Sequence, residues 1–505
     1  MNLADLTFLW PELILLASAA LVFVLDAVGP RSRGTRFLGE NGFLPSLALA
    51  GLAAAMLGLI PSLGRPPQVV ASMLALDPFA LFFKALAIIG VAVVILTAIP
   101  HMRGRTPYSG EFYALLLIAG LAICLAVSAT NLVMLYLAME FLSITSYVLA
   151  GFLRQDRKSG EAALKYFLYG ATASAVMLYG MSLLYGATGA TDLARIAAAL
   201  SAADASTGSS ARLTWLGLPA IVLLLAGFGF KASLAPFHQW APDTYEGAPT
   251  PVTAFLSTAS KAAGFAILMR VFLVALAPLT SQWIALLIVI SVLTMTVGNL
   301  TALRQTNVKR LLAYSSIAQA GYMLIGVAAV VGAGAGASPA PTFTGINGVL
   351  IYLFAYLFTN VGAFAVVTAI ETATGNVELE EYSGLIRRAP WLAALLLICL
   401  LSLTGIPPTG GFVGKFFVFG AAVQQQMWGL AAIAAVNSVV AAFYYLNIVR
   451  CMFFAPAEEN AGPINVALPL QGAIAVTVLV TLLLGLAPGP LIAWASQSVR
   501  LLALK

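Results

Sequence analysis

Residues 216–242 read LGLPAIVLLLAGFGFKASLAPFHQWAP, an apolar run interrupted by glycines, prolines and one lysine. Lys231 follows Gly227 and Gly229, and Pro236 comes five residues later. A lysine at the centre of a membrane helix costs roughly 2.5–3.5 kcal/mol on insertion scales. A proline there frees backbone carbonyls, which is tolerated only where protein or water satisfies them. The run therefore predicts a broken membrane helix with a titratable group beside the break.

Residues 400–420, LLSLTGIPPTGGFVGKFFVFG, repeat this pattern. Gly405, Pro407, Pro408 and a Gly-Gly pair precede Lys415. The two stretches lie five expected spans apart, an odd number, so the two helices cross the membrane in opposite directions. Inverted repeats produce this arrangement, and sites in such folds lie at the interrupted helices.

The composition agrees with an all-α integral membrane protein. Of the 505 residues, 61% are hydrophobic and 9% are charged, against about 25% charged in soluble domains. Fourteen apolar runs are long enough to cross about 30 Å of hydrocarbon. They lie near 8–28, 43–62, 79–100, 112–130, 131–152, 161–187, 216–236, 249–276, 282–303, 309–330, 344–370, 390–423, 427–453 and 468–492.

The spans suggest four regions. We expect an N-terminal three-helix segment (1–111), a first five-helix repeat (112–276, spans 4–8), a second, inverted repeat (277–453, spans 9–13) and a C-terminal helix (454–505). The longest linker, 188–215, is rich in Ala, Ser and Thr and is expected to be a loop. Most loop lysines and arginines follow odd-numbered spans, which predicts cytoplasmic odd loops and two periplasmic termini in a bacterial inner membrane.

Charged residues inside the spans mark candidate functional positions. They are Glu140, Lys165, Lys231, Lys261 and Lys415, all expected to be deep, and Lys84 and Arg270, which are close enough to a helix end to snorkel. His238 follows Lys231 by seven residues and would share its helical face if the helix continued, so it is a further candidate for proton relay. Hydroxyl and amide side chains within the spans could hold a water chain or simply join helices. They include Ser174, Ser257, Ser315, Ser316, Gln319 and Tyr322.

Cofactor chemistry on this chain is not expected. The three cysteines have no CxxC spacing, and the two histidines are far apart in sequence. This argues against haem, iron–sulfur and zinc sites. The net charge of +6 is scattered among short loops and does not indicate a nucleic-acid partner.

Two stretches resemble a known family. KASLAPFHQWAPDTYEGAPTPVTAFLSTASKAAGFA (231–266) and SLTGIPPTGGFVGKFFVF (402–419) are similar to the antiporter-like membrane subunits of respiratory complex I, and the second to subunit N in particular. The resemblance covers essentially the whole chain. It implies proton translocation coupled to NADH–quinone oxidoreduction, with FMN, iron–sulfur clusters and quinone on partner subunits. Membrane lipids, the other membrane subunits and, through them, the peripheral redox arm are the expected partners.

The resemblance also assigns roles to the charged residues. Glu140 and Lys231 become a coupled ion pair, Lys165 a modulating neighbour, Lys261 a central relay and Lys415 the lysine of the far half-channel. A Na⁺/H⁺ antiporter component and a passive membrane scaffold remain alternatives. The motif in span twelve argues against the first, and the deep lysines argue against the second.

Overall fold

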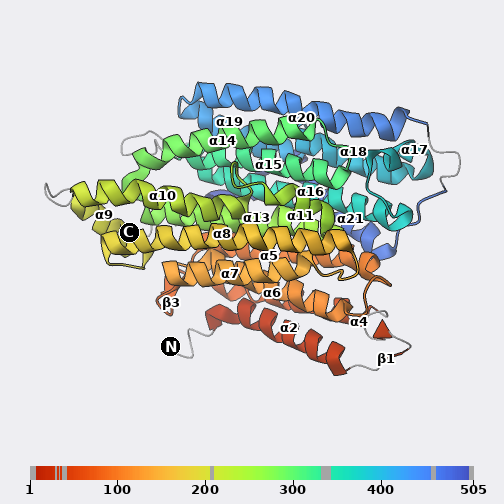
Figure 1. Cartoon of the computed structure of the whole chain (residues 1–505), viewed down its shortest axis with the longest axis horizontal. Coiled ribbons are helices and arrows are strands. Elements are labelled where there is room, and N and C mark those ends of the chain that lie inside the picture. Colours follow the sequence, from red (N-terminus) through yellow and green to blue (C-terminus); the bar gives the residue numbers. More distant parts are fainter. Residues whose placement is uncertain are drawn as a thin grey trace.

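Long helices packed side by side make up the computed structural model, which describes residues 7–28, 31–32, 35–36, 42–204, 210–330, 343–456 and 462–499. The helices run along the horizontal axis of Figure 1, and the stack extends from α2 at the bottom to α20 at the top. Within the described residues, twelve helices are long and apolar enough to cross a membrane, and each falls in an expected span. The expectation of an all-α membrane protein is confirmed.

The membrane-length helices keep the order of the expected spans. They are α2 (Trp10–Val28), α4 with η2 (Phe43–Ser62), α5 (Pro78–Met102), α6 (Ser109–Ser128), α7 (Leu132–Ala150), α8 (Arg157–Thr188), α12 to η4 (Thr250–Ala275), η5 with α14 (Ala277–Ala302), α15 (Val308–Ala328), α16 (Gly345–Thr374), α20 (Trp428–Phe454) and α21 (Leu468–Leu486).

The other two expected spans are each interrupted. At span seven (216–236), α10 (Ser210–Ala232) ends before Pro236 and the short α11 (Trp240–Gly247) follows the expected span, whereas span twelve consists of α18 (Pro390–Thr404) and α19 (Gly410–Gln424). Both expected breaks are therefore present. The grouping of the spans into two inverted repeats stays a prediction.

Polar caps set several helix boundaries. The narrow gap between the fourth and fifth spans is one of them, because the Asn131 side chain accepts a hydrogen bond from Val133 N at 2.9 Å and begins α7. Asp156, Asn307 and Thr344 cap α8, α15 and α16 in the same way. Side-chain caps supply the acceptors that the first turn of a helix lacks.

The expectation of a loop at 188–215 is wrong. The described part of this linker contains helix α9 (Leu193–Asp204) and the start of α10. Alanine is a strong helix former, and its abundance in 193–204 explains the error. In the C-terminal region a further helix, α22 (Gly489–Val499), follows α21. The short elements are η1 (Thr7–Leu9), η6 (Leu379–Tyr382), α17 (Leu385–Arg388) and two antiparallel hairpins, β1–β2 (Arg31–Ser32, Thr35–Arg36) and β3–β4 (Gln68–Val70, Leu74–Leu76).

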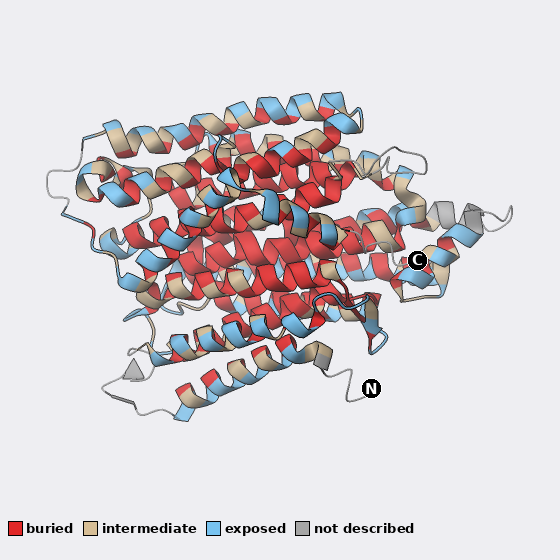
Figure 2. Ribbon diagram, turned by 180° about the vertical axis from the view of Figure 1, so that it is seen from behind, coloured by how far each residue is buried: buried red, intermediate tan, exposed pale blue. Residues whose placement is uncertain are grey.

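Burial separates central helices from peripheral ones. Figure 2 shows buried residues concentrated through the middle of the bundle and exposed ones along its outer helices. In α15 and α16, 94% of the most apolar window is buried, against 33% in α2, α20 and α21. The segment α12 to η4, which carries Lys261, is 89% buried. A charged side chain on such a helix must find its partners inside the protein.

Lys84 and Arg270 do not snorkel, contrary to expectation. Lys84 Nζ lies 2.6 Å from Glu12 Oε1 of α2. Arg270 makes two hydrogen bonds to the Asp77 carboxylate, at 2.9 and 3.0 Å, and all four residues are buried. A carboxylate from another part of the bundle lies at the level of each cation, so pairing replaces extension toward water.

Removing one partner of the Arg270–Asp77 pair should destabilise the fold strongly. Arg270→Ala leaves the Asp77 carboxylate buried without its partner, which costs about 3–5 kcal/mol. The measurement is the free energy of unfolding of the purified protein in mixed detergent micelles. Arg195→Ala, on the exposed side of α9, is the control and should change that energy by less than about 0.5 kcal/mol. Equal stabilities of the two variants would contradict the prediction.

Candidate functional site

Lys261 lies where a π-helical turn meets a regular helix. The span begins as α12 (Thr250–Phe255), widens into the π turn η3 (Leu256–Ser260) and continues as α13 (Lys261–Arg270). Such turns occur frequently at functional sites. Lys261 Nζ donates to the backbone carbonyl of Ser316 at 2.7 Å and to its hydroxyl at 2.5 Å. Among the described residues no carboxylate lies within 4 Å of this amine.

Lys231 is the penultimate residue of α10, next to the break. Its Nζ donates to Ser143 Oγ on α7 at 3.3 Å and is buried. Glu140 precedes Ser143 by three residues on α7, and its carboxylate accepts a hydrogen bond from Ser174 Oγ of α8 at 2.5 Å. Within the described residues Glu140 and Lys231 form no direct ion pair: Lys231 binds the Ser143 hydroxyl, and Glu140 binds the Ser174 hydroxyl. The pair assigned by resemblance is close but not in contact.

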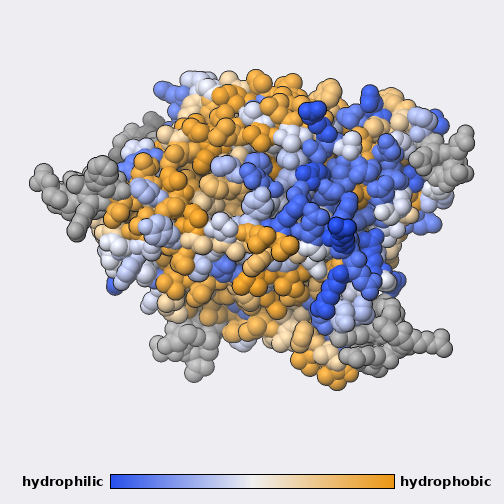
Figure 3. Space-filling view, in the orientation of Figure 1, coloured by the Kyte–Doolittle hydropathy of each residue, from blue (hydrophilic) through white to orange (hydrophobic). Residues whose placement is uncertain are grey.

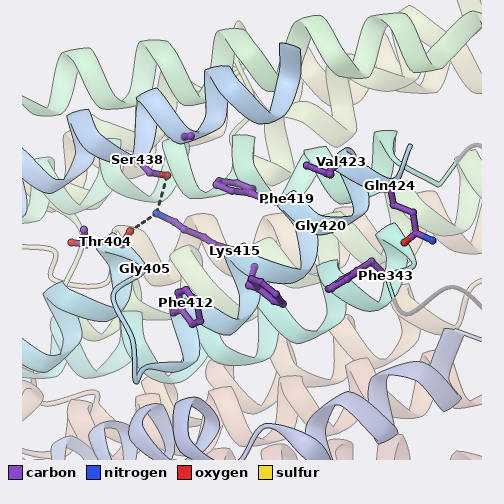
Figure 4. A pocket seen from close by; sticks show the side chains of 12 residues that line it. Phe343, Thr404, Gly405, Phe412, Lys415, Phe419, Gly420, Val423, Gln424 and Ser438 are labelled. Carbon is purple, nitrogen blue, oxygen red and sulfur yellow. Dashed lines mark hydrogen bonds between the residues drawn. The ribbon is translucent and has the colours of Figure 1, made fainter. Parts of the chain in front are cut away.

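Lys415 reaches across the second break. Figure 4 shows its amine directed at Thr404 and Ser438. Nζ donates to the Thr404 carbonyl at 2.8 Å and to Ser438 Oγ at 3.4 Å, and it lies 4.6 Å from the ring centre of Tyr322. The Thr404 carbonyl is freed by the end of α18, and a cation is favoured at the carboxyl end of a helix. The break therefore supplies the oxygen that the buried amine needs.

An aromatic cavity of about 790 Å³ adjoins Lys415. Its walls come from the loop before α16 and from α18, α19 and α20, and Figure 4 shows the aromatic rings around it. The lining includes Phe343, Phe412, Phe416 and Phe419.

Polar side chains link Lys261 to Lys415 through α15. Ser315, next to the Ser316 that binds Lys261, hydrogen-bonds the Tyr445 hydroxyl. Gln319 Nε2, one turn further on, donates to that hydroxyl at 3.2 Å and to the Leu403 carbonyl at 2.9 Å. Leu403 directly precedes the Thr404 that accepts from Lys415. The row of hydroxyl and amide groups thus runs from one lysine to the carbonyls beside the other.

Lys165 is not deep, contrary to expectation. Its side chain is 39% exposed and pairs with Glu161 at 2.8 Å and with Asp243 of α11 at 2.7 Å. Helix α8 begins at Arg157, so Lys165 lies near its start, two and a half turns before the Ser174 that binds Glu140. The side chain lines a polar pocket of about 180 Å³, and hydrophilic surface gathers in this part of the face in Figure 3.

His238 does not share a helical face with Lys231. Residues 233–239 separate α10 from α11, and Ser233 takes a left-handed backbone conformation with φ of 59°. The helix therefore does not continue between the two residues. His238 is partly buried, and its Nδ1 makes no direct hydrogen bond within the described residues.

Sequence reasoning missed several polar residues around the lysines. Ser143 could have been found, because it lies one helical turn from Glu140. Tyr445, Ser438 and Asn360, whose Nδ2 donates to Ser257 Oγ at 2.8 Å, come from distant helices and carry no local signal. A further buried cluster contains Glu371, which accepts from Thr250 and lies 3.6 Å from Arg105.

These features define a polytopic membrane protein with unpaired amines in its interior. The chain belongs to the NADH:quinone oxidoreductase/Mrp antiporter transmembrane family, whose model matches residues 129–441. It is 40% identical over 499 residues to NADH-quinone oxidoreductase subunit N of Trichlorobacter lovleyi, covering 99% of this chain and 98% of the relative. It is 42% identical to subunit N of Moorella thermoacetica, covering 98% of both. The resemblance to subunit N is confirmed.

Solved structures have the same architecture. A chain of respiratory complex I from Thermus thermophilus is 35% identical, with a TM-score of 0.77 over 96% of this chain and 98% of that one. A chain of the Mrp complex from Dietzia sp. DQ12-45-1b has a TM-score of 0.79 over 99% and 97%, at 22% identity. The second likeness shows a shared fold and no more.

A side chain at position 405 is expected to destabilise the fold. It ends α18 with φ of 93°, and a Cβ there would lie 2.8 Å from Cδ of Lys415. Gly405→Ala should lower the free energy of unfolding by about 1–2 kcal/mol, because an L-residue is strained in this region. Unfolding in detergent micelles measures the effect. Gly472→Ala, inside α21 with open space around it, is the control and should be neutral or stabilising. A loss at both sites would point to a general cost of added methyl groups.

Proposed function

We propose that this chain is the subunit N-type membrane component of a proton-pumping NADH–quinone oxidoreductase. Two relatives named NADH-quinone oxidoreductase subunit N align with this chain over nearly their whole length. The observation that supports translocation most strongly is the series Lys231, Lys261 and Lys415, three buried amines that contact no carboxylate of the described part of the chain. The amine of each lysine donates a hydrogen bond to hydroxyl or carbonyl oxygens, and these oxygens can also accept hydrogen bonds from water. The chain would take part in the enzyme as its translocating module.

The proposed mechanism is a transfer of protons along the lysine series. Desolvation disfavours the ammonium form of a buried amine, and a nearby carboxylate favours it. Glu140 lies close enough to Lys231 to support a bound proton there, while each group is hydrogen-bonded to a different serine hydroxyl, Ser174 and Ser143 respectively. A rearrangement that separates Glu140 from Lys231 would then release the proton toward Lys261. Lys261 would act as the relay, and Lys415 would serve the access path opposite to that of Lys231.

The redox chemistry would belong to other subunits. FMN, iron–sulfur clusters and quinone are expected on partners, and the other membrane subunits would join this chain to the peripheral arm. The positive loops would face the cytoplasm and both termini the periplasm of a bacterial inner membrane. Lys165 would modulate the Glu140–Lys231 pair.

Experiments can distinguish two alternative functions from this proposal. The fold is shared with a chain of an Mrp complex at 22% identity, which leaves an antiporter component as the second candidate. Co-purification with an FMN- and iron–sulfur-containing dehydrogenase supports the first proposal, and sodium-dependent proton exchange by the chain without such a partner supports the second. A passive scaffold would tolerate loss of the lysines.

Loss of the charge of Lys231 or of Glu140, both in the expected first repeat, should impair proton pumping. We expect Lys231→Ala and Glu140→Gln to lower NADH-driven proton translocation while the complex still assembles, because one removes the buried proton acceptor and the other its charge partner. Proton-to-electron ratios and turnover in membrane vesicles measure the effect. Glu380→Gln, an exposed carboxylate on η6, is the control and should match the wild type. Wild-type ratios with normal turnover in both test variants would disprove the ion-pair assignment.

Lys261 must lose its proton if it is a relay. Guanidinium stays protonated at any relevant pH, so Lys261→Arg should be nearly as damaging as Lys261→Ala in the same pumping assay. Lys158→Arg is the control, since Lys158 is an exposed member of an ion pair and needs only its charge. Normal pumping by Lys261→Arg would mean that a fixed positive charge suffices, and the relay role would be wrong.

A further inference from the structure

Helix α11 is held in place by ion pairs on its outer side. It packs against α8 and α15. Asp243 accepts from Lys165 at 2.7 Å and from Arg310 of α15 at 2.6 Å. Glu246 accepts from Arg310 and from Lys158, both at 3.1 Å. Two carboxylates on one short helix are therefore tied to cations on both neighbouring helices.

Tyr245 lies between these carboxylates in sequence but points into the core. It is fully buried. Its backbone carbonyl accepts from Thr253 Oγ1 at 2.9 Å, which fixes the residue against the start of the next span. Its hydroxyl lies near Ser233 in the break and Ser316 on α15, but it is not within hydrogen-bonding geometry of any described residue. The ion pairs that hold α11 thus also position a buried phenol.

Two such hydroxyls lie beside Ser316, and a third lies beside one of these two. Besides Tyr245, the hydroxyl of Tyr356 on α16 faces Ser316, and the Ser233 hydroxyl faces Tyr245. None of the three has a direct partner within the described residues. A buried hydroxyl without a partner costs about 1–3 kcal/mol, and a buried water with two to four polar neighbours offsets that cost. Converging hydroxyls of this kind supply the polar neighbours of a candidate water-binding site.

The site lies between two of the lysines. Ser316 is the residue that binds the Lys261 amine. Ser233 comes two residues after Lys231, and α10 packs on α13 so closely that a Cβ on Gly264 would lie 3.3 Å from Cβ of Lys231. Gly264 is one helical turn from Lys261. A tyrosine that served only for packing would need no hydroxyl there.

We propose that Tyr245, with Ser233, Tyr356 and Ser316, holds the water through which a proton passes from Lys231 to Lys261. The ammonium of Lys231 gives its proton to the hydrogen-bonded water, and that water gives one of its other protons to the neutral amine of Lys261. The Tyr245 hydroxyl accepts one hydrogen bond, donates another and ends the transfer unchanged. Lys165 and Asp243 act as positioning residues, because their ion pair fixes α11. The assignment rests on the proposed function.

The test is Tyr245→Phe in the intact complex, which removes the hydroxyl and keeps the ring. We expect pumping-coupled turnover to fall about tenfold, less than the 10²-fold typical of a lost acid–base group, because a second water can take the place of the hydroxyl. The solvent deuterium isotope effect on turnover should rise, since proton transfer becomes limiting. Tyr382→Phe is the matched control: Tyr382 is equally buried and its hydroxyl also lacks a hydrogen-bond partner among the described residues, but it lies near Glu371 instead of the lysines.

Asp243→Asn tests the positioning role. It should raise the same isotope effect, and Asp243→Glu, which keeps the charge, should restore the wild-type value. If Tyr245→Phe does not assemble, Tyr356→Phe carries the test with the same expectation.

The outcomes distinguish a failure of the Tyr245 assignment from a failure of the proposed function. Wild-type turnover and isotope effect in Tyr245→Phe, with Lys231→Ala and Lys261→Ala both impaired, overturn the role of Tyr245 and leave the proposed function standing. Normal pumping by both lysine variants overturns the proposed function as well. An equal loss in Tyr382→Phe means that the hydroxyls matter for packing and also overturns the assignment.

Discussion

An amine placed in the middle of a hydrocarbon layer needs oxygen atoms close to it, because no water is there to bind it. Interrupting a helix releases carbonyls at the level of the interruption, and Lys415 uses the Thr404 carbonyl at the end of α18. Lys261 instead uses the carbonyl and hydroxyl of Ser316 within the continuous helix α15, and Lys231 uses the Ser143 hydroxyl of α7. At Lys415 the break supplies the oxygen that the amine needs, whereas the other two lysines depend on serines of neighbouring helices.

The charged groups inside the bundle fall into two kinds. Arg270–Asp77 and Lys84–Glu12 are direct pairs of opposite charge, and removing one partner leaves a buried uncompensated ion. Lys231, Lys261 and Lys415 are bound by neutral oxygen atoms instead. A fixed pair stabilises the fold and keeps its proton. An amine held by neutral groups can change its protonation state without breaking an ion pair, which suits a path for protons.

The break in span seven also allows α10 and α11 to be oriented independently. Helix α10 carries Lys231 in the core, while α11 carries carboxylates that reach the polar pocket beside Lys165. A continuous helix would couple the orientation of both parts rigidly. With residues 233–239 between them, ion pairs near the surface can fix α11 independently and, through it, the buried Tyr245.

The sequence by itself determined the class of the fold and the candidate lysines. Span length, the Pro and Gly clusters and the cost of a buried charge all depend on local composition, so the two breaks and Lys231, Lys261 and Lys415 could be identified without coordinates. Only the tertiary structure decided which partners the charged side chains have. Lys165 meets Asp243, and Arg270 meets Asp77 193 positions away. Pairings between helices depend on how the helices pack, and a sequence read along one chain contains no distance between them.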